Sequence, residues 1–168
     1  MREFSVFKIQ KNGGEAKAQF VQNTELPSEI PVSTPFTFPF FENREVVLCK
    51  DKNGWWNPLG GHIESGESWE QAVIREAYEE AGVEIGNLVL FGYVRVKQSN
   101  MGISGYPPVS VLPFTTSGVI RINEYWQPRE TLDRIVCDFQ SAFNLFQLRE
   151  DNRQMEEIFR TAIQSKGY

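Results

Sequence analysis

The chain has 168 residues and a formal net charge of −5 at pH 7; 40% of its residues are hydrophobic and 23% are charged. These values are typical of a folded globular domain and exclude a disordered or collagen-like chain. The acidic balance excludes a broad nucleic-acid-coating surface, which needs an excess of lysine and arginine. Cys49 and Cys137 show neither metal-ligand spacing nor a disulfide framework, so we expect reduced thiols.

Residues 1–35 are predicted to form strands and an extended segment packed on the remainder of the chain. Residues 4–9 alternate like a strand, and a turn at Gly13-Gly14 leads to a second strand near residues 18–22. Four prolines between residues 26 and 39 favour an extended crossing of the surface. We find no leader-like apolar region and no run near the ~18 residues of a membrane span, which predicts a cytoplasmic protein.

Two short strands are expected next, at residues 36–41 and 45–50, around a turn at Asn43-Arg44. Residues 46–49 are continuously apolar, which is typical of a strand that is buried on both faces. A loop that contains several glycines follows at residues 51–66.

The strongest local signals predict a helix over residues 69–81. Ser68 and Gln71 have the spacing of a capping box, and Gly82 stands where a left-handed residue ends a helix. The apolar stripe that should face the core consists of Val73, Ala77 and Ala81.

Beyond this helix we expect strands at residues 87–98, 109–116 and 119–126, with a loop at residues 99–108. Apolar residues then recur at helical spacing from Glu130 onward, which predicts a second helix, and a third is expected around residues 155–162. The aromatic residues on these stripes are interpreted as core.

Acidic residues are concentrated between residues 64 and 84. One arginine against seven glutamates leaves a charge of −6 in this segment, and therefore +1 in the rest of the chain. Glu76, Glu79 and Glu80 are spaced i, i+3 and i+4, so they share one helix face. Such carboxylates repel one another unless a cation binds, and their oxygens favour Mg²⁺, Mn²⁺ or Ca²⁺. A solvated acidic helix face is the structural alternative. Metal-assisted chemistry on polyphosphates is the natural use of such a site.

Residues 61–83 resemble the signature of the Nudix hydrolase family, G-x5-E-x7-R-E-U-x-E-E-x-G-U, in which U is a bulky apolar residue. The matching positions are Gly61, Glu67, Arg75, Glu76, Ala77, Glu79, Glu80, Gly82 and Val83. Ala77 is smaller than the usual aliphatic residue. Upstream, Pro58-Leu59 stand in the reverse of the usual order.

The resemblance implies an α/β fold, an α/β/α sandwich around a mixed β-sheet, with residues 1–168 as a single domain. It implies Mg²⁺ as cofactor, for which Mn²⁺ can substitute. Glu79 and Glu80 are then the main metal ligands, joined by Glu76 and the carbonyl of Gly60. Arg75 is expected to pair with Glu67 and to orient the metal-binding face, and Glu76 serves as the base in some members.

Family members often use one more acid outside the signature, and we take Glu124 as the first candidate and Glu130 as the second. An ordinary surface carboxylate is the alternative reading of either residue.

Five residues are candidates for substrate binding: Lys50, Trp56, Gly61, His62 and Tyr106. Gly61 lets the backbone approach the phosphates closely, Lys50 could reach a phosphate and Trp56 could stack a base. For Lys50, Trp56 and His62, ordinary surface or packing roles stay open.

The expected reaction is hydrolysis of a phosphoanhydride in a nucleoside diphosphate linked to another moiety, most simply a nucleoside triphosphate. Three alternatives stay open: a catalytically silent nucleotide sensor, a hydrolase of RNA 5′ ends, and one of ADP-ribose-type substrates. We expect a small nucleotide as partner, no membrane and no extended nucleic-acid surface, and leave a homodimer open.

Overall fold

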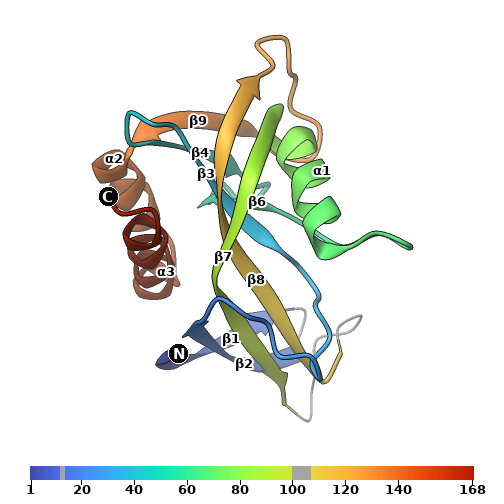
Figure 1. Ribbon diagram of the computed structural model, residues 1–168. Coiled ribbons are helices and arrows are strands. Elements are labelled where there is room, and N and C mark those ends of the chain that lie inside the picture. The colour runs from blue at the N-terminus through green and yellow to red at the C-terminus, as the bar shows by residue number, and fades with distance from the viewer. Residues whose placement is uncertain (12–13, 100–106) are drawn as a thin grey trace.

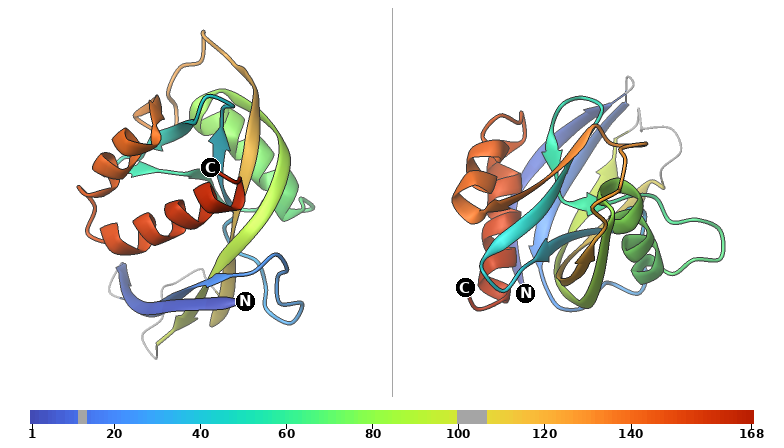
Figure 2. Two further views of the ribbon diagram at one scale, coloured as in Figure 1. Left: turned by 60° about the vertical axis from the view of Figure 1, so that its left-hand side comes forward. Right: turned by 90° about the horizontal axis from the view of Figure 1, so that it is seen from above.

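One mixed sheet lies between helices in the computed structural model, which describes residues 1–11, 14–99 and 107–168 (Figure 1). Within those residues the sheet has nine strands. Helix α1 covers one face of the sheet, and α2 and α3 cover the other (Figure 2). The predicted α/β class and mixed sheet are confirmed.

The strands are β1 (Arg2–Lys11), β2 (Gly14–Gln22), β3 (Phe36–Phe40), β4 (Glu45–Lys50), β5 (Trp56–Asn57), β6 (Leu59–Gly60), β7 (Val83–Gln98), β8 (Val109–Ile122) and β9 (Asp133–Asp138). The helices are α1 (Trp69–Ala81), α2 (Phe139–Phe146) and α3 (Asn152–Ser165). Neighbouring strands follow the order β1-β2-β7-β8-β3-β4-β5, with β6 paired to β3 and β9 paired to β4. Within this sheet β3 and β8 run parallel, whereas the other named pairs are antiparallel.

The N-terminal hairpin extends the sheet beyond β7. Strand β2 pairs with the second half of β7. Phe20 of β2 is buried in the aromatic core that lies between the sheet and helices α2 and α3. The predicted turn includes residue 13, which lies outside the described residues. The single-domain interpretation stays a prediction, favoured by this shared ladder and shared core.

Strand β4 is buried on both faces, as its apolar run predicts. Val46 and Leu48 belong to the cluster beneath α2 and α3, whereas Val47 and Cys49 belong to the cluster beneath α1. Because side chains alternate along a strand, four consecutive apolar residues supply both cores.

Helix α1 has the predicted ends. The Ser68 side chain accepts a hydrogen bond from the Gln71 N–H, and the Gln71 side chain accepts one from the Ser68 N–H. Gly82 is left-handed, with φ 62°, and β7 begins at the next residue. The capping box and the glycine stop therefore define the helix as the sequence indicates.

The helix predicted from Glu130 onward is wrong in its first part, because residues 133–138 form β9. Their apolar spacing fits either structure, and pairing with the full length of β4 decides for a strand. Asp138 then caps α2 by accepting a hydrogen bond from the Ser141 N–H. Likewise, the two strands expected at 109–116 and 119–126 are one strand, β8, which continues to Ile122.

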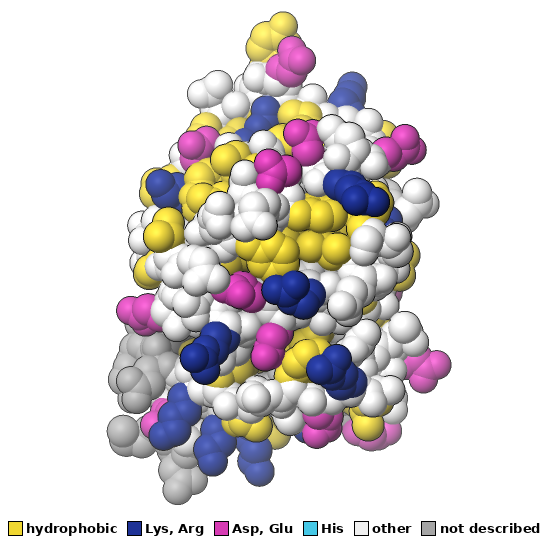
Figure 3. Space-filling view, turned by 90° about the vertical axis from the view of Figure 1, so that its left-hand side faces the viewer, with side chains coloured by type: hydrophobic (Ala, Val, Ile, Leu, Met, Phe, Trp, Pro, Cys, Tyr) yellow, Lys and Arg dark blue, Asp and Glu magenta, His cyan; other side chains and the backbone are white. Residues whose placement is uncertain are grey.

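The aromatic stripes of the C-terminal helices are core, as interpreted. Phe159 of α3 packs against five other phenylalanines, with distances of 5.0–6.2 Å between its ring centroid and theirs. On the outer side of α2 and α3, hydrophobic, acidic and basic side chains are interspersed (Figure 3). Among the described residues, no helix has both the length and the apolarity needed to span a bilayer.

Replacing Gly82 by alanine should destabilise the fold strongly. An L-residue with positive φ costs about 1–2 kcal/mol, and the added Cβ would overlap the Trp126 side chain. We expect a loss of about 3 kcal/mol in urea unfolding. Gly66→Ala is the matched control, since Gly66 has φ 84° but nothing within 4 Å of an added Cβ. Equal losses in the two variants would refute the steric contribution of Trp126.

Candidate active site

The Glu80 carboxylate is held against the short strand that precedes α1. The Gly60 N–H donates a hydrogen bond to Glu80 Oε2 at 2.8 Å, and the Cys49 thiol donates one to the same oxygen at 3.6 Å. Helix α1 and strands β4 and β6 therefore meet at this carboxylate. The sequence expectation concerned the Gly60 carbonyl, whereas the contact seen here uses the Gly60 N–H.

Glu76 lies one helical turn earlier and is buried, with 7% of its surface exposed. A Cβ on Gly61 would overlap the Glu76 carboxylate, so only glycine allows the backbone to lie against it. The Gly60-Gly61 backbone thus contacts the buried Glu76 and the partly buried Glu80.

The surroundings of Glu76 and Glu80 disfavour the ionised form of both carboxyl groups. Burial raises the pKa of Glu80 to about 7, and the charges of Glu76 and Glu130 add to this effect. Burial also raises the pKa of Glu76, although Arg75 acts in the opposite direction. The pKa of the Cys49 thiol is raised by burial and then by the Glu80 charge, which keeps it a neutral donor.

Arg75 organises the outer edge of the site. Its Nε donates to Glu67 at 3.0 Å, its Nη1 donates to Glu76 at 3.0 Å and to Glu79 at 2.7 Å, and its Nη2 donates to the His62 carbonyl at 2.8 Å. The expected Arg75–Glu67 pair is present, and its hydrogen bonds lower the pKa of Glu67. One guanidinium therefore joins two glutamates of α1 to the loop that precedes the helix.

The three signature glutamates are not equivalent. Glu76 and Glu80 face the Gly60-Gly61 backbone, whereas Glu79 is exposed and bound to Arg75. The sequence expectation made Glu79 and Glu80 the main ligand pair; the geometry instead favours Glu76 with Glu80.

The donor set fits a hard divalent cation. The buried Glu76 and the partly buried Glu80 both have raised pKa values and lie close enough to interact, and a cation between them would relieve both their repulsion and their lost hydration. In the described parts of the chain, no three His, Cys, Asp or Glu side chains are already arranged around one point. Arg75 binds Glu76 and Glu79 instead, so metal binding requires a local rearrangement of these side chains.

The acid outside the signature is better sought at Glu130 than at Glu124. The negative charge of Glu130 acts on both Glu76 and Glu80. Glu124 instead lines a hollow with Arg121 and Glu84, and its charge is not among the main influences on Glu76 or Glu80. The structure therefore favours the second candidate over the first.

The predicted substrate-binding residues are only partly brought together. Lys50 Nζ lies 5.7 Å from the centre of the Trp56 ring, on the adjacent strands β4 and β5. The side chain of His62 is exposed, and its carbonyl binds Arg75. Tyr106 lies outside the described residues. Gly61 lies against the Glu76 carboxylate, and its role toward phosphates stays a prediction.

Three residues that the sequence analysis overlooked close the C-terminal end of α1. The last carbonyls of a helix have no partner within it. Here Trp126 Nε1 donates to the Glu79 carbonyl at 3.0 Å, the Thr131 hydroxyl to the Glu80 carbonyl at 2.7 Å, and Arg134 to the Ala81 carbonyl at 2.6 Å. Trp126 and Thr131 lie in the loop between β8 and β9, and Arg134 lies at the start of β9; no local motif marks any of them.

A family model for the NUDIX domain matches residues 35–159. A Nudix hydrolase of Bacillus subtilis named YvcI is 45% identical over 51 residues, which are 30% of this chain and 32% of that protein. The NAD-capped RNA hydrolase NudC of Pseudomonas aeruginosa is also 45% identical over 51 residues, 29% of this chain and 18% of that protein. The chain thus matches about a third or less of each of these relatives.

Solved structures show the same fold at low sequence identity. The pyrophosphohydrolase BsRppH of Bacillus subtilis has a TM-score of 0.61 at 19% identity and covers 82% of this chain and 77% of that one. A NUDIX hydrolase from Nitrosomonas europaea has a TM-score of 0.60 at 19% identity, over 77% of this chain and 88% of that one.

The raised pKa of Glu80 predicts a pH-dependent stability in the absence of metal. The folded protein keeps a proton that an unfolded glutamate releases near its usual pKa of 4.5, so stability should fall as the pH rises from about 4.5 to 7. Glu80→Gln should remove the contribution of Glu80, leave the weaker one of Glu76, and stabilise the protein at pH 8 by about 1–3 kcal/mol. Urea unfolding at pH 5 and pH 8 in chelator tests this.

Glu79→Gln is the matched control for this measurement, because Glu79 is its exposed neighbour on the same helix. Parallel pH profiles for the wild type and Glu80→Gln would contradict the assignment of the buried proton to Glu80.

Proposed function

The chain belongs to the Nudix hydrolase family, and we propose that it is a Mg²⁺-dependent pyrophosphohydrolase that acts on a small nucleotide. The observation that carries this proposal is the pair of carboxylates, buried Glu76 and partly buried Glu80, packed against the Gly60-Gly61 backbone. A chain that had lost catalysis has no evident reason to keep two charged groups in a place that disfavours their charge.

Glu76 and Glu80 would hold the cation, with Glu130 completing the acidic set. When bound, Mg²⁺ offsets the negative charge of the phosphates and makes a water molecule easier to deprotonate. Gly61 leaves the site open to phosphates, because a side chain there would fill the space beside Glu76. Arg75 fixes Glu76 and Glu79 from the outer edge.

In the proposed reaction, the oxygen of water forms a bond to phosphorus and the bridging P–O bond of the anhydride breaks. The proton of the water passes to Glu79, since it is exposed to solvent and Arg75 holds it in place at 2.7 Å. The products are two phosphate-bearing fragments. Arg75 and Glu67 act here as positioning residues, because Arg75 contacts Glu76 and Glu79 and Glu67 holds Arg75.

A small nucleotide is the substrate that we favour, and cytoplasmic localisation stays the sequence-based expectation. A structure of a nematode Ap4A hydrolase shares the fold, with a TM-score of 0.54 at 16% identity, but at that identity it supports the fold alone. The alternative of a silent sensor predicts nucleotide binding without turnover, which the next experiment distinguishes.

Glu80→Gln should abolish most Mg²⁺-dependent hydrolysis while the fold stays intact. The amide keeps the shape but not the charge that binds the cation, so we expect kcat/KM to fall about 100-fold or more. Phosphate and pyrophosphate release is measured over nucleoside triphosphates, ADP-ribose, nucleotide sugars and dinucleoside polyphosphates. Undiminished turnover in the folded, Mg²⁺-saturated variant would refute the assignment of Glu80 as a metal ligand.

The same assay separates the two candidates for the additional acid. Glu130→Gln should raise the Mg²⁺ concentration needed for half-maximal activity about 10-fold, a typical effect of losing a group that supports a metal site. Glu124→Gln should leave that concentration unchanged, and the reverse result would restore Glu124 as the ligand.

A second candidate substrate, the 5′ end of RNA, is favoured by one observation. Lys8, Lys17 and Lys97 stand directly opposite one another on β1, β2 and β7. They alternate with core residues such as Ala18 and Val96, so they lie on the sheet face opposite α2 and α3, which is the face of α1. Like charges in such a row repel one another, and a phosphate backbone would offset that repulsion.

If RNA binds along this row, the double variant Lys17→Ala, Lys97→Ala should bind a triphosphorylated oligonucleotide more weakly than the wild type does. Its binding of a nucleoside triphosphate should be unchanged. The slope of log KM against log salt should shrink by about 1.4, since each phosphate contact contributes about 0.7 for a single strand. An unchanged slope would leave the small nucleotide as the substrate.

A further inference from the structure

We propose that the hollow between α1 and the β8–β9 loop binds the nucleobase of the substrate. This inference rests on the proposed function, because it assigns the base of a nucleotide whose phosphates lie at the acidic site. The hollow has a volume of about 360 Å³ and is lined by Tyr78, Tyr125, Trp126, Asn123 and Gln127, among others. That volume lies within the range of small-ligand sites, roughly 300–1,000 Å³.

Two aromatic side chains at this hollow are unusually exposed. Tyr125 is 88% exposed and Tyr78 is 46% exposed. Large aromatic surfaces are normally buried. A nucleobase that stacks on an exposed ring covers it, and such stacking is possible for every base. The amides of Asn123 and Gln127 add donors and acceptors of the kind that a base edge needs.

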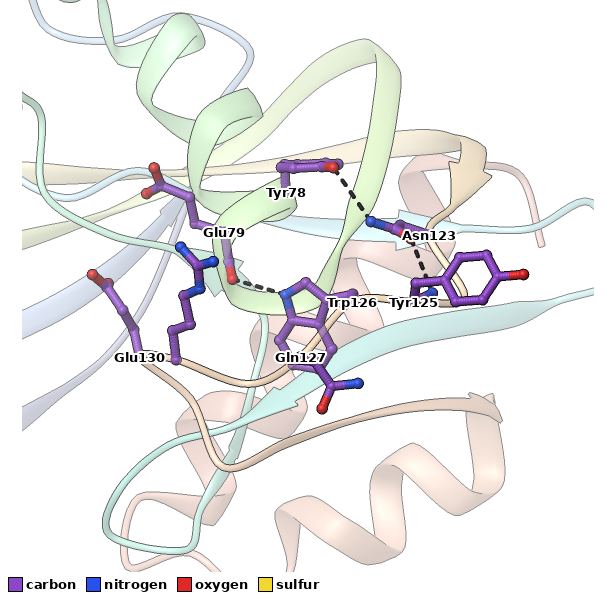
Figure 4. A pocket seen from close by; sticks show the side chains of 8 residues that line it. Tyr78, Glu79, Asn123, Tyr125, Trp126, Gln127 and Glu130 are labelled. Carbon is purple, nitrogen blue, oxygen red and sulfur yellow. Dashed lines mark hydrogen bonds between the residues drawn. The ribbon is translucent and has the colours of Figure 1, made fainter.

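Two side chains of the hollow are held in place before any ligand arrives, Tyr78 and Trp126. Asn123 donates to the Tyr78 hydroxyl at 3.3 Å and accepts from the backbone N–H of Tyr125 at 3.0 Å, so this amide joins the Tyr78 side chain to the backbone of Tyr125 (Figure 4). Trp126 is fixed by its bond to the Glu79 carbonyl and by Arg134, 5.2 Å from its ring centre. Pre-positioned walls lower the entropic cost of binding.

The hollow extends to Glu79 and Glu130, at the edge of the acidic site, and has one aromatic end and one charged end. Tyr78, Asn123 and Tyr125 lie at one end, whereas Glu79 and Glu130 lie at the other (Figure 4). Glu130 is the same carboxylate whose charge acts on Glu76 and Glu80. Arg129 also lines the hollow and offers a positive charge to a phosphate. A base at the aromatic end thus leaves its phosphates beside the catalytic carboxylates.

The test compares the binding of nucleoside 5′-monophosphates (AMP, GMP, CMP and UMP) with that of ribose 5-phosphate, by calorimetry with Mg²⁺ present. These probes contain no anhydride, so the result does not depend on hydrolysis and can fail separately from the proposed function. We expect the best nucleotide to bind about 5- to 100-fold more tightly than ribose 5-phosphate.

Tyr78→Ala and Tyr125→Ala should each remove most of that preference, whereas Tyr78→Phe and Tyr125→Phe should keep it. Leu148→Ala, an exposed residue distant in sequence from this hollow, is the control. The proposal is overturned if no nucleotide binds better than ribose 5-phosphate, or if the preference survives both alanine substitutions, which would place the base elsewhere, for example at Trp56.

Discussion

The C-terminal end of α1 is the constraint on which the site depends. A helix leaves its last carbonyl groups without partners, and here the carbonyls of three consecutive residues are bound by Trp126, Thr131 and Arg134. Arg134 also places a positive charge where the helix dipole is negative. The same bonds that complete the helix bring the β8–β9 loop, and with it Glu130, against the acidic face.

The second organising feature is electrostatic. Helix α1 concentrates carboxylates that would repel one another in isolation, and the structure separates them into two environments. Arg75 neutralises the outer edge through Glu67 and Glu79 and also binds Glu76, whereas Glu80 is partly buried and accepts hydrogen bonds from an N–H and a thiol. A cation therefore gains most beside Glu80, since Arg75 already offsets the charge of Glu67, Glu76 and Glu79.

Local sequence signals predict the structure well where neighbours in sequence decide it. The capping box and Gly82 define α1, and the apolar run 46–49 identifies the strand that serves both cores, because caps and side-chain alternation are short-range properties. Prediction fails where a distant partner decides. Residues 133–138 have the spacing of a helix but pair with β4, and the choice between Glu124 and Glu130 depends on how a loop folds back onto α1.

The same limit applies to the hollow beside the site. Tyr78 belongs to α1, whereas Asn123 and Tyr125 lie 45 and 47 residues further along the chain, and no spacing rule relates them. The Nudix signature therefore indicates the chemistry of the α1 face but says little about which substrate reaches it. Recognition depends on the long-range packing of the β8–β9 loop.

Gly82 is the single residue between α1 and β7. Adding or removing one residue here would rotate the α1 carboxylates by about 100° relative to the sheet, or turn each side chain of β7 to the opposite face. The number of residues between Glu76 and Val83 is therefore constrained by the packing of α1 on the sheet. The spacing of the signature thus reflects this packing as well as the chemistry of the signature side chains.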